Sequence, residues 1–259
     1  MVDDLVPGGE EVLGESSLQL EAGVVGSQVD AHAGSVSPVR TVLGLDGRRR
    51  RWAGALLGPA DRVSFLDLAD ARAALAAADA AGAVAIGVDA PIGLPEAGSR
   101  AADLAARRAL AGPGRAAGRV FAAPPLAVLR ATTHAEAVRL ARELTGRGVS
   151  VQTWNLRHAI ASAAELAADG RVVEVHPELS FLAMAGRVLP RKKTGEGRAA
   201  RLAALAAALP GLDRGTVPGH DDAVDALACA WSARRWAAGQ AQVLGGEPDA
   251  TGRPMRIVT

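Results

Sequence analysis

The sequence predicts an α/β protein in which helices flank a mixed β-sheet. Three β-prone segments, residues 40–47, 52–58 and 62–68, follow one another closely enough to form an antiparallel meander. Two later apolar runs, at 83–90 and 171–177, are separated by segments of helical composition, which is typical of parallel strands. The first of these runs, AVAIGVDA, has no polar alternation, so we expect helices to cover both of its faces. The sheet should therefore begin antiparallel and continue with parallel strands.

The remaining segments have helical composition and are separated by Gly and Pro. Gly82 is a suitable helix end, and the prolines and glycines of 91–98 exclude a helix there. Ser99, then Thr132 or Thr133, and later Thr194 are suitable N-caps. The expected helices are 68–82, 99–110, 134–146, 152–169, 177–185, 194–209 and 220–239.

One elaborated domain is expected over residues 40–239, with a helical insertion at about 99–170 between two of its strands. Residues 1–39 carry seven acidic residues and no Lys or Arg, and we expect a disordered or weakly ordered acidic extension. Residues 40–259 then hold all 29 Lys and Arg and 21 acids, a net charge of +8, which is compatible with a polyanionic substrate. An arginine-rich surface without a binding role stays an alternative. Residues 240–259 are left as a C-terminal tail.

The composition excludes several classes of protein. No apolar run reaches the length of about 18 residues that a membrane span needs, and the acidic N-terminus does not resemble a signal peptide. The single cysteine, Cys229, excludes an intrachain disulfide and indicates a cytoplasmic protein. With three Phe, four Trp and no Tyr, aromatic platforms for base stacking are not expected.

Three predicted strands each carry one carboxylate at or near their end. These are Asp46, Asp89 and Glu174. Burying an unpaired carboxylate at the end of a strand costs roughly several kcal/mol of folding free energy, so each of these three acids needs a cation, a metal or N–H donors. Other interpretations stay open: Asp46 precedes Gly47 and suits a hairpin turn, Asp89 could accept backbone N–H groups of its loop, and Glu174 could lie at a solvated edge.

The last predicted helix begins with three aspartates. Asp221 is explained by the favourable interaction of acids with a helix N-terminus. Asp222 and Asp225 are three residues apart and share a helix face, and Asp225 lies beside the apolar stripe of Val224 and Ala228. We therefore expect at least one of Asp222 and Asp225 to act as a ligand.

Together these acids predict a hard-metal site. Carboxylates without a Cys cluster favour Mg²⁺ or Mn²⁺ over structural zinc. Such ions activate water and stabilise the leaving oxygen in phosphodiester cleavage. The predicted catalytic and metal-binding residues are Asp46, Asp89, Glu174, Asp222 and Asp225.

Basic residues and histidines stand close to these acids in the sequence. Lys192, Lys193 and Arg198 could hold a substrate phosphate near a helix start, or they could form a solvated basic turn. The same two interpretations apply to the basic run 48–51. His176 and His220 could position a water or take a proton, although a histidine at a strand end is more often simply hydrogen-bonded.

Six segments of the chain resemble the family known as domain of unknown function 429 (DUF429), whose members are expected to be nucleases of the RNase H-like superfamily. The segments occur in the family's order within about residues 40–239. They are GLDGRRRRWAGALLG, GVDAPIGLP, SRAADLAARRAL with VFAAPP, EVHPELSF, KKTGEGRAARLAAL and HDDAVDALACAWSA.

The resemblance implies an RNase H-like mixed sheet with a three-stranded antiparallel start, parallel strands after it and flanking helices. It implies that Asp46 is the acid of the first strand and Asp89 the acid of the fourth. Glu174 corresponds to the family's fifth-strand motif, and the last helix supplies Asp222 or Asp225, as in Holliday-junction resolvases of the superfamily.

The function expected from these observations is a metal-dependent nuclease that acts on DNA or RNA and uses Mg²⁺ or Mn²⁺. A non-catalytic nucleic-acid-binding or regulatory domain on the same fold is the alternative. An actin-like phosphotransferase fits less well, because the basic run replaces a Ser/Thr phosphate hairpin and no second Gly-rich phosphate motif is visible.

Overall fold

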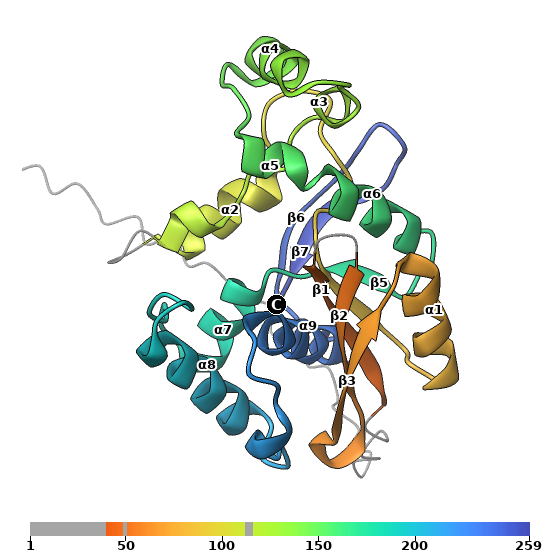
Figure 1. The fold of residues 1–259 in the computed structure, drawn as a ribbon, viewed down its shortest axis with the longest axis vertical. Coiled ribbons are helices and arrows are strands. Elements are labelled where there is room, and N and C mark those ends of the chain that lie inside the picture. Colours follow the sequence, from red (N-terminus) through yellow and green to blue (C-terminus); the bar gives the residue numbers. More distant parts are fainter. Residues whose placement is uncertain (1–39, 49–50, 112–115) are drawn as a thin grey trace, which may run out of the picture. The chain divides into compact units, whose positions relative to one another are not determined.

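A five-stranded sheet in the order β3-β2-β1-β4-β5 organises the fold (Figure 1). The computed structural model of the protein describes residues 40–48, 51–111 and 116–259. The expected acidic extension, 1–39, lies outside the described residues, and so does the middle of the basic run 48–51. The strands are β1 (Val42–Arg48), β2 (Arg51–Leu57), β3 (Val63–Leu68), β4 (Ile86–Asp89) and β5 (Val172–Glu174).

The pairing of these strands confirms the predicted mixed sheet. β1 pairs antiparallel with β2, and β2 pairs antiparallel with β3, which makes the expected meander. β4 lies parallel to β1, and β5 lies parallel to β4. The helices that cover the sheet come from the segments before β4, between β4 and β5, and after β5.

Most helices begin and end where their sequence signals indicate. Thr133 and Thr194 are N-caps whose hydroxyls accept N–H bonds from the first turn, and Gly82 follows α1 with a φ of +60°. The helices are α1 (Ala71–Ala80), α2 (Ala101–Ala109), α3 (Leu126–Leu129), α4 (His134–Thr145), α5 (Val151–Asn155), α6 (Arg157–Leu166), α7 (Pro177–Ala185), α8 (Gly195–Ala208) and α9 (Asp221–Ala237).

Two expectations about the helical insertion were wrong. The N-cap of α2 is Arg100 and not Ser99, and the Arg100 side chain makes no capping hydrogen bond but joins a buried ion-pair network. The single helix expected over 152–169 is two helices, since Ser150 caps an earlier start and the chain turns at Leu156 between α5 and α6.

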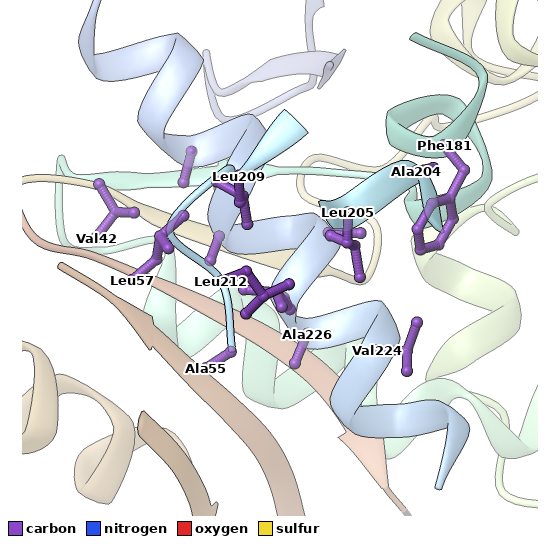
Figure 2. Packing of buried hydrophobic residues seen from close by; sticks show 14 of the residues in the cluster. Val42, Ala55, Leu57, Phe181, Ala204, Leu205, Leu209, Leu212, Val224 and Ala226 are labelled. Carbon is purple, nitrogen blue, oxygen red and sulfur yellow. The ribbon is translucent and has the colours of Figure 1, made fainter. Parts of the chain in front are cut away.

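Alternating residues of the central strands supply two separate cores. Val42 of β1 faces α9 and packs with residues of α7 and α8, a cluster that Figure 2 shows from close by. Leu43 and Leu45 point to the other face, where they pack with α1 and α6. Figure 1 shows α9 on one side of the sheet and α1 with α6 on the other. The sheet is therefore the middle layer of three.

The segment after α9 forms a hairpin that the sequence did not predict. β6 (Val243–Pro248) and β7 (Pro254–Val258) pair antiparallel. Val258 forms a parallel bridge to Val175, just beyond β5, and Ile257 packs with apolar residues of α2. Within the described residues, no helix has the length and apolarity needed to cross a membrane.

Candidate functional site

Asp46 and Asp89 lie side by side at the ends of two adjacent parallel strands. They are direct register partners of β1 and β4. Asp46 lies within the ladder, opposite Ala53 of β2, and the ladder continues to the pair Arg48–Arg51, so this carboxylate is not the hairpin-turn residue. The proximity of the Asp89 carboxyl raises the pKa of Asp46. The structure thus brings together the first two acids of the predicted site.

Helix α9 approaches the sheet closely at this point and adds a third acid. Gly44 and Gly87, two residues before Asp46 and Asp89, are also register partners and point to the face that α9 covers. A Cβ at Gly44 would lie 1.9 Å from the carbonyl oxygen of Ala226, so only glycine permits this contact. Asp225, one residue before Ala226, is 2% exposed and contributes to the same electrostatic environment as Asp46 and Asp89.

Lys192, between α7 and α8, supplies a positive charge to the three carboxylates. Its Nζ donates a hydrogen bond to Oδ2 of Asp225 at 2.6 Å. Burial alone would lower the pKa of Lys192, but Asp225, Asp46 and Asp89 together raise the pKa above its ordinary value. The residue predicted to bind phosphate thus pairs with an acid of the predicted metal site.

The carboxylates hold more negative charge than one lysine balances. Burial raises the pKa of Asp46 well above its usual range, and the nearby Asp89 and Asp225 raise it further. Burial also raises the pKa of Asp225, to about 6, although Lys192 opposes this effect. An additional cation would lower the electrostatic cost of ionising both groups.

Glu174 does not join this cluster, because it lies on the other face of the sheet. The β4–β5 register pairs Glu174 with Val88, which packs toward α1 and α6. Arg100 donates to both oxygens of the Glu174 carboxylate at 2.7 Å, and the N–H of Ile92 donates a third bond at 2.7 Å. The carboxylate thus accepts three hydrogen bonds, and Glu174 lines the same pocket as Asp46 and Asp89, while its role as a metal ligand stays a prediction.

Of the two competing acids at the start of α9, Asp225 faces the cluster and Asp222 does not. Asp222 lies 3.3 Å from Nε of Arg48 and its side chain is 33% exposed. The N-cap is His220, whose Nδ1 accepts the N–H of Ala223, and Asp221 lies in the first turn. The rotation of the helix therefore decides between acids that the sequence could not separate.

The other basic residues of the prediction lie in different places. Lys193 is exposed and lines the same pocket as the acids. Arg198 instead donates to the carbonyl oxygen of Pro218 and lies 3.8 Å from Asp221. Of the predicted phosphate-binding residues, Lys192 and Lys193 therefore lie at the pocket, while Arg198 supports the start of α9.

The acids open into a pocket of about 820 Å³, which lies within the size range of ligand sites. Its wall includes His176, whose Nδ1 is buried and has no hydrogen-bond partner among the described residues. The wall also includes Arg100 and Asp103, whose buried ion pair was not predicted although their i, i+3 spacing was a signal for it. Phe121 is a further wall residue that no sequence signal identified.

The donor set has the chemistry that Mg²⁺ or Mn²⁺ prefers, since Asp46, Asp89 and Asp225 offer only carboxylate oxygens. Across the described ranges, no three His, Cys, Asp or Glu side chains are arranged to hold a metal ion as they stand. The ammonium group of Lys192 also pairs with one oxygen of Asp225. The three aspartates therefore suit a divalent cation in ligand type and charge, and Lys192 would compete with that cation for Asp225.

Comparison with known proteins identifies the family. The family described as proteins of unknown function, DUF429, matches residues 44–250, which include the strands of both sheets up to the middle of the last hairpin. Neither a curated protein nor a solved structure matches the chain. The match covers most of the chain, so this protein belongs to the DUF429 family.

Proposed function

We propose that the protein is a metal-dependent nuclease with an RNase H-like fold that hydrolyses phosphodiester bonds in DNA or RNA. The observation that carries the proposal is the meeting of Asp46, Asp89 and Asp225 at one end of the sheet. The mixed sheet with its antiparallel start is of the kind that an RNase H-like fold requires. The buried free Cys229 is compatible with the cytoplasmic location that belongs to the proposal.

Asp46, Asp89 and Asp225 would hold the Mg²⁺ or Mn²⁺ ion. When bound, the ion supplies a Lewis acid and an activated water for attack on phosphorus. The exposed Lys193 at the pocket wall can bind an approaching phosphate as a point charge. His176 lines the same wall, and its buried Nδ1, which has no partner among the described residues, can accept a hydrogen bond or a proton.

The test is cleavage of labelled single- and double-stranded DNA and RNA in Mg²⁺, Mn²⁺ or EDTA. We expect metal-dependent cleavage that Asp46→Asn and Asp89→Asn each reduce by a factor of about 10² or more, the scale of losing one preorganised electrostatic group. Asp222→Asn is the matched control, because its acid is paired with Arg48 instead of the cluster. Absence of cleavage with every metal, or full activity in both variants, would refute the nuclease.

A second candidate is a nucleic-acid-binding domain without catalysis. The observation that favours it is the Lys192–Asp225 ion pair, because a lysine that balances part of the negative charge lessens the need for a metal. The same assay separates the two candidates, since nucleic-acid binding that needs no metal and leads to no cleavage would support the binding domain.

A further inference from the structure

Phe121 is the exposed aromatic residue of the chain, and it lies at the wall of the pocket that contains the acids. All four Trp and three Phe fall within the described residues, and Phe121, at 49% exposure, is the only one of them classed as exposed. Leaving a large ring in water forgoes the stabilisation of burying it, which is about 1.5–3 kcal/mol. Single exposed apolar residues are common on protein surfaces, and what distinguishes Phe121 is that its ring belongs to the wall of this pocket.

The backbone around Phe121 is held firmly by its neighbours. Val120 is buried, and its carbonyl oxygen accepts two hydrogen bonds from the guanidinium of Arg107. On the other side, the N–H of Ala123 donates to the buried carboxylate of Asp103 at 2.8 Å. Arg119 donates to Glu178 at 2.7 Å. The exposed ring therefore lies on a segment whose neighbouring residues are fixed by hydrogen bonds to α2 and α7.

The buried network behind this segment connects it to the end of the sheet. Asp103, which binds the N–H of Ala123, is also paired with Arg100, and Arg100 is paired with Glu174 at the end of β5. Asp46, Asp89 and Lys193 line the pocket together with Phe121. An aromatic surface, a basic group and carboxylates therefore share one cavity of about 820 Å³.

We propose that Phe121 is a stacking subsite for an unpaired nucleobase, so that the ligand of this pocket is single-stranded nucleic acid or an unpaired end. The inference rests on the proposed function and adds the substrate class to it. Every base has a π-face that can stack on an aromatic ring, independent of sequence. A base in a duplex must first be unstacked and unpaired at a cost of a few kcal/mol, roughly, so duplexes should bind less well.

The test is fluorescence anisotropy with a labelled single-stranded oligonucleotide of about 12 nucleotides in EDTA, where no metal-dependent cleavage occurs. We expect Phe121→Ala to weaken binding about tenfold and Phe121→Trp to preserve it. An abasic oligonucleotide of the same length should bind the native protein about as weakly as the normal one binds Phe121→Ala. Leu104→Ala is the matched control, because Leu104 is 43% exposed outside the pocket.

The inference is overturned if Phe121→Ala binds like the native protein, if the abasic strand binds equally well, or if no single strand binds. Thermal unfolding of each variant shows whether it is folded, and Phe121→Trp keeps the test valid should Phe121→Ala be unstable. Binding that depends on Phe121 without cleavage in Mg²⁺ or Mn²⁺ would refute the nuclease but retain the stacking subsite. Metal-dependent cleavage with a KM that Phe121→Ala leaves unchanged would support the nuclease and refute the stacking subsite.

Discussion

Gly44 of β1 and Gly87 of β4 are register partners, and the backbone of α9 lies against both of them. An added Cβ would lie 1.9 Å from the Ala226 oxygen at Gly44 and 2.5 Å from the Cys229 oxygen at Gly87. This close approach places Asp225 of α9 beside the acids that follow the two glycines. The candidate site therefore depends on two residues that carry no side chain.

Gly44→Ala is expected to destabilise the protein by about 3 kcal/mol or more, because the clash is with helix backbone that cannot move aside easily. Urea unfolding measures the loss. Gly47→Ala in the same strand is the control, since a Cβ there meets its nearest atoms at 3.5 Å, and its cost should stay within about 1 kcal/mol. Equal stability of the two variants would contradict the close packing of α9.

The strands and most helices were predictable because their signals are local. β-prone runs, Thr133 and Thr194 as caps, and Pro177 at the start of α7 each act within a few residues. The hairpin after α9 was not predicted, because its apolar residues Ile257 and Val258 are buried only by distant elements.

The sequence identified the acidic residues of the candidate site, but it could not show which of them lie together. Asp46 and Asp89 follow from strand ends, whereas the face of Glu174 depends on the β4–β5 register, which no short segment of sequence specifies. The choice of Asp225 over Asp222 depends on the rotation of α9. Amino-acid composition argued against stacking residues, yet one exposed Phe121 suffices for a subsite.

Glu174→Gln is expected to lower the free energy of unfolding by about 3 kcal/mol, because it removes a charge that a buried Arg100 needs. Glu143→Gln is the matched control: Glu143 forms an Arg–Glu pair with Arg139 whose side chains are more than half exposed, and the cost should be below about 1 kcal/mol. Urea unfolding of both variants measures the difference. A stable Glu174→Gln protein that has lost Mn²⁺ binding would instead favour the ligand role predicted from sequence.

The stability of the protein should carry a pH dependence from Asp225. Its pKa is raised to about 6 in the folded protein, so between pH ~4 and ~6 the folded state binds more protons than the unfolded state. The contribution of Asp225 to stability is therefore full at the acid end of this range and is lost as the pH rises through about 6. Asp225→Asn, which stays neutral, should gain about 3 kcal/mol over the native protein between pH ~4 and ~7.

Urea unfolding at several pH values checks this sign. The quantity of interest is the difference between Asp225→Asn and the native protein, because the titrating groups that do not interact with Asp225 cancel in it. Asp222→Asn controls for the loss of one carboxylate at the same end of α9. A difference that is constant with pH, or that falls as pH rises, would show that Asp225 does not carry the raised pKa.

The central claim is that Asp46, Asp89 and Asp225 together bind a divalent cation. Isothermal titration calorimetry with Mn²⁺ and Mg²⁺ tests it on the native protein and on Asp46→Asn, Asp89→Asn and Asp222→Asn. We predict that the native protein and Asp222→Asn bind the metal, and that Asp46→Asn and Asp89→Asn lose the binding, because each replaces one carboxylate ligand with an amide. Absence of binding by the native protein, or equal binding by all four proteins, would contradict the claim.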